Sequence, residues 1–331
     1  MNVAVVILNW NGEKLLQQFL PSVIKHSKEA TVYVADNAST DNSISFISEN
    51  FPTVKIIKNQ SNGGYAKGYN DALRNLTEDI FVLVNSDIEV TENWLPPVLS
   101  EFTNDAKLVA AQPKILDYNN QDYFEYAGAA GGFIDRYGYP FCRGRIFNTL
   151  EKDEGQFDDI KEIFWATGAC LFIRKTAFQE VAGFDEDFFA HQEEIDLCWR
   201  LLSKGGTIKY VGASSVFHVG GATLGAANPK KTFYNFRNTL LVLLKNVQGL
   251  QLWLILFVRL LLDGIAGIQF LLQGKPKHML AIIKAHFSFY ALFYKMFKKR
   301  RLKTIDLDYY FVNSIVWDYF FLRKKTFKNL Y

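Results

Sequence analysis

The 331-residue sequence predicts an α/β fold with a mostly parallel central sheet flanked by helices, followed by a helical C-terminal region. Short apolar runs at 3–8, 31–35, 54–57 and 81–84 alternate with segments whose apolar residues recur at helical spacing. Such alternation is typical of βαβ units, whose strands pair in parallel. From residue 239 onward the strand pattern ends and apolar residues become dense, which predicts helices.

The first part of the chain follows this alternation element by element. The continuous apolar run at 3–8 predicts a buried strand, and the leucines after it are spaced as in a helix. The strand at 31–35 precedes a helix that Ser39 or Thr40 can cap. The run at 81–84 stops on Asn-Ser-Asp, which predicts a central strand with polar residues just beyond its carboxyl end.

After residue 113 the elements become shorter and less regular. Glycines and aromatic residues at 124–145 predict a hairpin over an irregular loop, and 164–174 predicts a bent strand or a strand pair. A helix opens near residue 191, and two short strands are expected between 208 and 217.

Two aspartates follow predicted strands, and ligands of open α/β sheets bind at those strand ends. Asp36 can accept hydrogen bonds from a ribose or a base. Asp87 is suited to a divalent cation, which prefers oxygen ligands and can bridge to phosphate oxygens. The competing interpretation is ordinary turn chemistry, because Asn, Ser and Asp all favour turns.

The segment from Asn62 to Asn70 places paired glycines before a predicted helix. Gly63 and Gly64 let the backbone approach a ligand closely, and a helix N-terminus favours anions. Lys67 adds a point charge. The segment is neither a GxGxxG after the first strand nor a P-loop, which disfavours dehydrogenase and P-loop functions.

Three acidic residues, Glu193, Glu194 and Asp196, open the helix near residue 191. A carboxylate there can act as a general base, although acidic residues in a first turn also complement the helix dipole. His218, which precedes two glycines, is either a metal ligand or a core histidine.

Together these motifs resemble those of family 2 glycosyltransferases, in particular the bacterial rhamnosyltransferase-like enzymes. The resemblance covers about residues 1–245. The motifs, in the family's order, are Val-Val-Ile-Leu-Asn-Trp-Asn-Gly at 5–12, Asp-Asn-Ala-Ser at 36–39, Asn-Gly-Gly-Tyr-Ala-Lys-Gly-Tyr-Asn at 62–70, Asn-Ser-Asp at 85–87, Gly-Phe-Asp-Glu at 183–186 and Glu-Glu-Ile-Asp-Leu-Cys-Trp-Arg at 193–200.

The resemblance implies a GT-A fold, a nucleotide-diphosphate sugar donor, a Mg²⁺ or Mn²⁺ ion and inversion at the anomeric carbon. It implies a catalytic domain at 1–238, with a nucleotide-binding half at about 1–112 and an acceptor half at about 113–238, and a helical region at 239–331. The implied site residues are Asn9, Asp36, Asn62, Gly63, Gly64, Lys67, Asn85 and Asp87 for the nucleotide-sugar, Asp87 and His218 for the metal, Glu194 and Glu193 for catalysis, and Trp165, Gly168, Asp196 and Arg237 on the acceptor side.

This sequence departs from the family pattern at two places. The family's DxD-type motif is here Asn-Ser-Asp, so Asp87 is its one ionic ligand. The family's Glu-Asp is here Glu193-Glu194, and Glu194 aligns with the Asp, so we expect Glu194 to be the base. Consecutive helical residues point about 100° apart, so both carboxylates cannot face the acceptor equally.

The C-terminal region has the composition of an interfacial helical segment. Its longest uncharged stretch before Arg259, at 246–258, is shorter than the ~20 residues that span a bilayer, and Asp263 follows. Aromatic residues interleave with basic ones after residue 264, which suits an anionic membrane surface. The basic residues, nine between 264 and 305 without an acidic one, are Lys275, Lys277, Lys284, Lys295, Lys298, Lys299, Arg300, Arg301 and Lys303.

Other interpretations of this region are a spanning hairpin and a subdomain packed on the catalytic domain or on a second copy of the chain, as in a homodimer. No nucleic-acid motif accompanies the basic run, so nucleic acid is not an expected partner. The chain begins with a predicted strand rather than a signal peptide, and its three cysteines are far apart, as in a reducing compartment. We therefore expect a cytoplasmic protein, peripheral on the inner face of the plasma membrane.

The predicted function is transfer of a sugar to a glycan or lipid-linked glycan acceptor in surface polysaccharide synthesis. A sugar-nucleotide nucleotidylyltransferase has a similar sheet but carries a Gly-rich, Arg-containing loop after its first strand, which residues 9–12 do not match. The non-enzymatic alternative is a glycan-binding or assembly scaffold with a degenerate site, because Asn-Ser-Asp has a single carboxylate.

Overall fold

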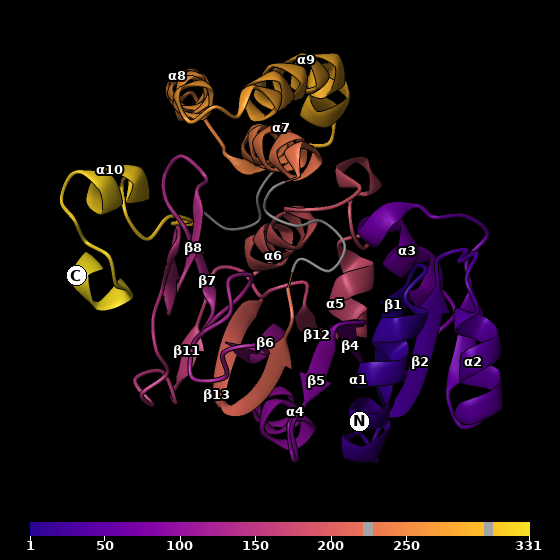
Figure 1. The fold of residues 1–331 in the computed structure, drawn as a ribbon. Helices are drawn as coiled ribbons and strands as arrows, with labels where there is room; N and C mark the ends of the chain where they lie inside the picture. Colours follow the sequence, from indigo (N-terminus) through magenta and orange to yellow (C-terminus); the bar gives the residue numbers. More distant parts are fainter. Residues whose placement is uncertain (221–227, 301–306) are drawn as a thin grey trace.

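The computed structural model describes residues 1–220, 228–300 and 307–331. A nine-stranded mixed sheet carries helices on both faces, and a four-stranded sheet lies beside it. The C-terminal helices stack above the catalytic part, with α7 lying between α6 and the α8–α9 pair (Figure 1).

The strands are β1 (Val3–Asn9), β2 (Thr31–Asp36), β3 (Lys55–Lys58), β4 (Ile80–Asn85), β5 (Ile88–Val90), β6 (Leu108–Asp117), β7 (Gly132–Ile134), β8 (Pro140–Cys142), β9 (Arg145–Ile146), β10 (Thr149–Leu150), β11 (Ile160–Glu162), β12 (Cys170–Arg174) and β13 (Thr207–His218). The α-helices are α1 (Glu13–His26), α2 (Ser43–Asn50), α3 (Gly64–Leu73), α4 (Leu95–Asn104), α5 (Lys175–Glu180), α6 (Glu193–Ser203), α7 (Pro229–Asn246), α8 (Gln251–Leu272), α9 (Pro276–Lys298) and α10 (Ile315–Phe320). Two short 3₁₀ helices are η1 (Glu186–Phe188) and η2 (Phe327–Leu330).

The large sheet has the order β11-β13-β6-β12-β4-β1-β2-β3, with β5 paired to β13. Strands β1 to β4 pair in parallel as predicted, but β12 inserts antiparallel between β4 and β6. In register, Asn9 lies opposite Asp36 and Leu8 opposite Asn85, so the polar ends of three neighbouring strands meet at one edge.

Both faces of this sheet are buried, which explains the continuous apolar runs in its strands. On β1, Val3, Val5 and Ile7 pack with α1, α2 and α4, whereas Ala4 and Val6 face the core that includes α3, α5 and α6. Side chains of successive strand residues point to opposite faces, so one run serves two cores.

Three local expectations differ from the structure. Asn42, not Ser39 or Thr40, precedes α2 as its N-cap residue. The two short strands expected between 208 and 217 are one strand, β13, interrupted by a register shift between Val211 and Ser215. The proposed domain division after residue 238 lies inside α7, so we propose that the helical region begins at Pro229.

Charged residues do not interrupt α8 as the sequence suggested. Arg259 donates from Nε to Asp263 Oδ1 at 2.8 Å, and both side chains are buried against the protein. Arg259 also donates to the Tyr137 carbonyl and lies 3.7 Å from the Tyr139 ring centroid. Among the described residues, α8 is the one helix long and apolar enough to cross a membrane, by length and composition alone.

The basic residues of the C-terminal region are used in two ways. Lys295 and Lys299 pair with Asp187 and Asp185, and Arg300 donates to the carbonyls of Leu244 and Val247. Lys295 and Lys299 thereby hold the end of α9 on the catalytic part, whereas Arg300 holds the residues after α9 on the C-terminal end of α7. Lys275, Lys277, Lys284 and Lys298 have no carboxylate partner within the described ranges, and Arg301 and Lys303 lie outside them.

Candidate active site

The amide of Asn9 joins two strand ends at the centre of the sheet. Its Nδ2 donates to Asp36 Oδ1 at 3.1 Å and to Ser39 Oγ at 3.2 Å. Asp36 Oδ2 accepts from the Ser39 backbone N–H, which requires Ala38 to adopt a φ of 60°. Only 2% of Asp36 is exposed, and the hydrogen bonds of its carboxylate shape the loop at the end of β2.

The glycine pair at 63–64 serves contact between two loops. Asn62 Oδ1 accepts from the Gly64 N–H at 3.0 Å, and the Tyr65 N–H donates to the Phe189 carbonyl at 2.9 Å. Gly64 has a φ of 78°, and a Cβ on it would lie 2.4 Å from the Phe189 oxygen. The close approach that Gly64 permits is therefore made by the Phe189 loop, whereas a Cβ on Gly63 would meet the Lys67 side chain 2.7 Å away.

Lys67 lies on α3 with its ammonium 2.7 Å from Asp71 Oδ2. This pair spans one helical turn, and the hydrogen bond to Asp71 raises the pKa of Lys67. The expected free point charge beside the helix N-terminus is instead paired in this structure.

Asp87 and His218 come together, as expected for a metal site. His218 ends β13, and its Nε2 lies 3.2 Å from Asp87 Oδ1 and 3.4 Å from Asn85 Nδ2. Its Nδ1 lies 3.3 Å from Glu125 Oε2. Burial disfavours the imidazolium, but the carboxylates of Asp87 and Glu125 outweigh that effect and raise the pKa of His218 to about 10.

These residues fit a cation whose coordination is completed by substrate. Carboxylate oxygen and neutral imidazole nitrogen are both metal ligands, and Mg²⁺ commonly uses one or two carboxylates together with phosphate oxygens. Because only the neutral imidazole binds a metal, a cation at Asp87 would have to displace the proton that the raised pKa of His218 places on the ring. Within the described ranges, no three or more His, Cys, Asp and Glu side chains gather as a self-sufficient metal site. A nucleotide diphosphate is therefore needed to complete the ligand set around Asp87 and His218.

The acidic pair begins α6 directly after a strained loop. Phe189, His191 and Gln192 adopt φ values of 65°, 67° and 73°. Such left-handed conformations are costly for residues other than glycine and are often found at functional sites. These residues set the direction in which α6 begins, so that Glu193 and Glu194 in its first turn face Tyr65 of α3.

The two glutamates differ in accessibility. Glu193 is 4% exposed, and its Oε2 has no hydrogen-bond partner in the described part of the chain. Glu194 is half-buried. Burial raises the pKa of Glu194 to about 7 and, with the charge of Glu194, raises that of Glu193 well above its usual range. A carboxylate with a pKa near 7 suits general-base catalysis.

One segment links the strand-end site to the acidic pair. The Asn85 N–H donates to the Ala169 carbonyl, and Tyr65 Oη donates to the Gly168 carbonyl at 2.7 Å. Burial, Tyr69 and both glutamates raise the pKa of Tyr65, which places that ring beside the pair. Gly168 thus lies between the strand-end site and the acidic pair.

Three residues expected on the acceptor side have other contacts. Asp196 is fully buried, and its carboxylate binds Lys245, Arg200 and Asn246 at 2.8–2.9 Å. Lys245 and Arg200, against the effect of burial, hold the pKa of Asp196 well below its usual range. Asp196 therefore fixes α6 to α7, because no part of its carboxylate reaches an acceptor.

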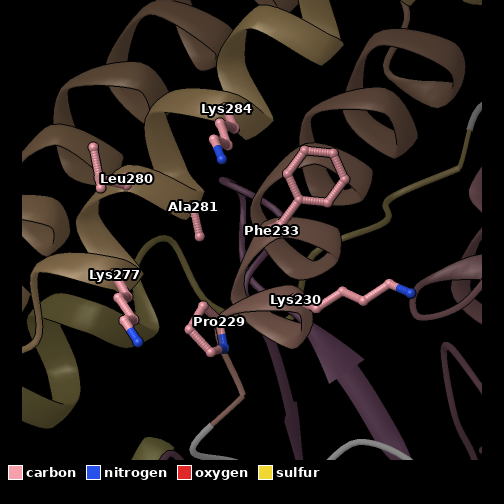
Figure 2. Close-up of a pocket in the computed structure, with 7 residues that line it drawn as sticks. All are labelled: Pro229, Lys230, Phe233, Lys277, Leu280, Ala281 and Lys284. Carbon is pink, nitrogen blue, oxygen red and sulfur yellow. The ribbon is translucent and has the colours of Figure 1, made fainter.

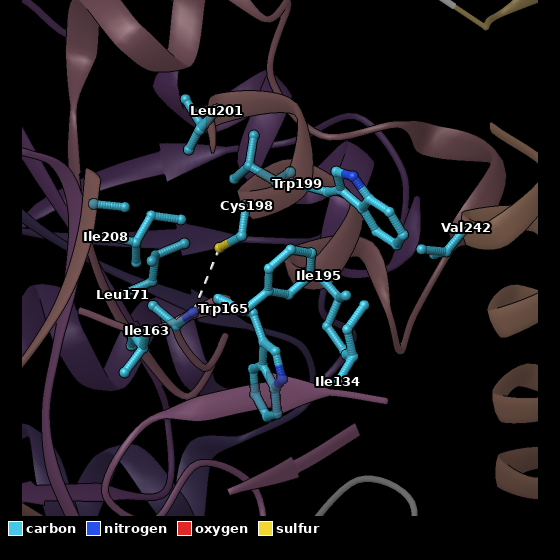
Figure 3. Packing of buried hydrophobic residues seen from close by; sticks show 14 of the residues in the cluster. Ile134, Ile163, Trp165, Leu171, Ile195, Cys198, Trp199, Leu201, Ile208 and Val242 are labelled. Atoms are coloured by element: carbon cyan, nitrogen blue, oxygen red, sulfur yellow. Dashed lines mark hydrogen bonds between the residues drawn. The ribbon is translucent and has the colours of Figure 1, made fainter. Parts of the chain in front are cut away.

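Trp165 is also internal. Its Nε1 donates to the Phe133 carbonyl, and its ring covers Gly132, where a Cβ would lie 2.1 Å away. Figure 3 shows Trp165 among the apolar side chains beneath α6, close to Cys198. Packing of this core therefore positions α6, and Trp165 does not line an acceptor surface.

Arg237 and Asn238 hold the strained loop from α7. Arg237 donates to the carbonyls of Asp187 and Phe188, and Asn238 Nδ2 donates to those of Phe188, Ala190 and His191. Arg237 thus positions the acidic pair through the backbone. Sequence reasoning missed Asn238, Glu125 and Tyr65 as site residues; of these, only Tyr65 lay inside a recognised motif.

Solved structures show the same fold. S. aureus TarS 1-349 in complex with UDP-GlcNAc has a TM-score of 0.55 at 14% identity, covering 92% of this chain and 95% of that one. The mannosyltransferase PcManGT from Pyrobaculum calidifontis, in complex with GDP-Man and Mn²⁺, has a TM-score of 0.52 at 14% identity, covering 90% and 84%. The predicted GT-A fold is confirmed.

Curated relatives are glycosyltransferases. N-acetylglucosaminyl-diphospho-decaprenol L-rhamnosyltransferase of Mycobacterium tuberculosis is 25% identical over 229 residues, which cover 65% of this chain and 75% of the relative. The low-salt glycan biosynthesis hexosyltransferase Agl10 of Haloferax volcanii is 22% identical, covering 60% and 61%. The family model "Glycosyl transferase family 2" matches residues 4–182, more than half of the chain. The protein is a glycosyltransferase, and it belongs to glycosyl transferase family 2.

Proposed function

We propose that the protein transfers a hexosyl or deoxyhexosyl group from a nucleotide-diphosphate sugar to a hydroxyl of a lipid-linked glycan. The observation that carries this proposal is the pairing of two groups across Gly168: Asp87 with His218 on one side, and Glu193 with Glu194 on the other. Inverting transfer needs a base at the acceptor hydroxyl and charge stabilisation at the leaving diphosphate. The two groups can supply one function each.

The donor occupies the strand ends. Asp87 and His218 would hold Mg²⁺ or Mn²⁺, with Asn85 beside them. When bound, the cation supplies Lewis-acid stabilisation of the negative charge that develops on the diphosphate. The loop shaped by Asn9 and Asp36 contacts the nucleoside, and Asn9 Oδ1, buried and without a partner among the described residues, is free to accept a hydrogen bond.

Glu194 removes the proton from the acceptor hydroxyl as the oxygen attacks the anomeric carbon. The bond to the nucleoside diphosphate breaks on the opposite side, which gives inversion. Glu193, more deeply buried, orients the acceptor, and burial together with the charge of Glu194 raises its own pKa well above the usual range. The raised pKa of Glu194 makes this carboxylate a stronger base than an exposed glutamate.

The acceptor is a sugar joined to a polyprenol through diphosphate, the class named for the mycobacterial relative. The outward face of α8 supports such a substrate. Leu254, Phe257, Leu261 and Ile265 are 55–62% exposed, whereas Arg259 and Asp263 point inward. We propose that this face lies in the interfacial layer of the cytoplasmic leaflet, where a lipid-linked acceptor is found.

A two-part experiment tests this function. Thermal shift with a panel of UDP-, dTDP- and GDP-sugars, each with Mn²⁺ or Mg²⁺, should identify a donor that raises the melting temperature only with metal. Labelled donor is then incubated with N-acetylglucosaminyl diphosphate carried on a short prenyl chain, and the lipid product is extracted. Metal-dependent label in the lipid supports the proposal; donor hydrolysis without label on any lipid-linked acceptor contradicts it.

A further inference from the structure

A groove of about 340 Å³ lies between the first turns of α7 and the N-terminal half of α9. Its floor is apolar and its rim is basic, as Figure 2 shows. The lining residues are Pro229, Phe233, Leu280 and Ala281 together with Lys230, Lys277 and Lys284. Neither the strand-end site nor the acidic pair contributes a side chain to it.

The lysines of this groove have no acidic partner. Within the described ranges, no carboxylate lies at ion-pair distance from Lys230, Lys277 or Lys284, although Lys295 and Lys299 on the same helix α9 are paired with aspartates. Lys277 and Lys284 are two uncompensated positive charges beside an apolar floor, and Lys230 adds a third that points away from them, which fits an anion that carries an apolar group.

Lys230 connects the groove to the active site. In Figure 2 its side chain extends away from Lys277 and Lys284. Its ammonium lies 5.8 Å from the Phe189 ring centroid, in the strained loop that precedes Glu193. The basic rim therefore runs from the groove to the loop that aims the acidic pair.

On the other side, an apolar stripe leads away from the groove along α9. It starts at Leu280, a lining residue, and continues through Ile283, Phe287, Tyr290 and Tyr294, which are 40–71% exposed. Residues at this spacing share one helix face. The path from the loop of the acidic pair thus runs over Lys230 to the groove and then along the stripe, whose far end at Tyr294 adjoins Lys295, the partner of Asp187.

We propose that the groove binds the diphosphate of the lipid-linked acceptor, with the prenyl chain following the α9 stripe. This inference rests on the proposed function, because it takes the acceptor class from there. In such an acceptor the order is sugar, diphosphate, prenyl chain, which matches the order of the three surface features. The lysines contact only the phosphates, so they select the lipid carrier and take no part in the chemistry.

The test measures binding of farnesyl diphosphate, with farnesol and inorganic pyrophosphate as comparison probes. Wild type should bind farnesyl diphosphate at least about tenfold more tightly than either probe, because only this molecule uses both rim and floor. The double variant Lys277→Gln/Lys284→Gln should weaken that binding by about tenfold or more, through loss of two charge-assisted contacts. The matched control is Lys275→Gln/Lys298→Gln. It removes the same charge from the two ends of α9, at positions that do not line the groove.

If the control variant loses farnesyl diphosphate binding as strongly as the double variant, binding depends on overall positive charge, and the groove proposal is overturned. If the double variant loses flotation with phosphatidylglycerol vesicles to the same extent as it loses farnesyl diphosphate binding, the lysines belong to the membrane surface and the groove proposal is overturned. Unchanged farnesyl diphosphate binding by the double variant also overturns it. Nucleotide-sugar binding with Mn²⁺ is measured on the same proteins and should be unaffected. If wild type binds no donor, the proposed function fails; if donor binding is intact but farnesyl diphosphate binding does not depend on the lysines, only the groove fails.

Discussion

The first strand of the nucleotide-binding half and the helix α8 differ in whether they bury charged residues, because α8 buries an ion pair beside the apolar Leu252, Ile255 and Leu256. In β1, the apolar Val3, Val5 and Ile7 are at most 4% exposed, and polar side chains lie only at the strand end. In α8, Arg259 and Asp263 are the buried pair, while Phe257 and Ile265 are 60% and 62% exposed. The position of a charged residue within an apolar helix therefore does not predict which face of the helix is exposed to solvent.

The difference follows from what each region packs against. The β-sheet needs two apolar layers, one on each face. Helix α8 instead docks through a face that combines the apolar Leu252, Ile255 and Leu256 with a charged pair, where Asp263 also receives His286 and Arg259 meets the Tyr137 carbonyl. Partners of this kind offset the desolvation cost of buried charges. Because the charged pair lies on the docked face, the outward face of α8 is apolar, and we propose that it contacts lipid.

Breaking the buried ion cluster between α6 and α7 should have the largest effect. Asp196→Asn leaves Arg200 without a carboxylate partner and Lys245 with Asp185 alone, at a fully buried position. Removal of one partner from such a cluster costs roughly 3 kcal/mol of unfolding free energy. Urea denaturation measures the change. Asp71→Asn, which removes a surface pair with Lys67, is the control and should leave the urea midpoint unchanged; equal midpoints for the two variants would refute a structural role for Asp196.

Substitutions in the acidic pair test the division of roles at the catalytic end. Glu194→Gln should lower kcat about a hundredfold or more and leave donor affinity intact, because only proton removal is lost. Glu193→Gln should mainly raise the acceptor KM. The reverse pattern in steady-state kinetics would make Glu193 the base, and unchanged turnover in both would reduce the pair to complementing the helix dipole.

Polar substitutions on the outward face of α8 test the helical side of the comparison. The triple variant Leu254→Gln/Leu261→Gln/Ile265→Gln should reduce vesicle partitioning at least about tenfold without lowering the melting temperature, since these side chains are exposed. Ile160→Gln, at an exposed position of β11, serves as control. A marked fall in stability would instead indicate that this face packs on protein.

The smallest expected effect is on pH dependence. With its pKa raised to about 7, Glu194 is protonated at pH 6, so kcat/KM should rise with pH and level off above pH 7. The folded state holds this proton more tightly than the unfolded chain, whose glutamate has a pKa of 4.5. Stability should therefore fall slightly as pH rises from about 4.5 to 7. A flat activity profile across this range would contradict the assigned pKa.

Sequence patterns predicted the features that depend on local order. The β1–β4 alternation and the acidic helix start follow from runs and motifs, whereas the joint role of Asp87 and His218 was implied only by the family resemblance. Features that depend on distant packing were not predictable. Glu125 reaches His218 only because β6 and β13 pair. Asp196 looked like an acceptor contact because its partner, Lys245, lies 49 residues away. Arg259 looked like an interruption because its carbonyl partner, at Tyr137, lies 122 residues away.

Metal-dependent release of nucleoside diphosphate by wild type and by Asp87→Asn tests the central claim most directly, namely that the strand ends form the donor site. The donor is the nucleotide-sugar selected by thermal shift, and product is measured with Mn²⁺ titrated from zero. We predict that wild type releases nucleoside diphosphate only with metal. In Asp87→Asn this release should fall about a hundredfold or more, because the only carboxylate ligand that the Asn-Ser-Asp motif offers the metal is gone. Equal release and an unchanged Mn²⁺ dependence in Asp87→Asn would contradict the account.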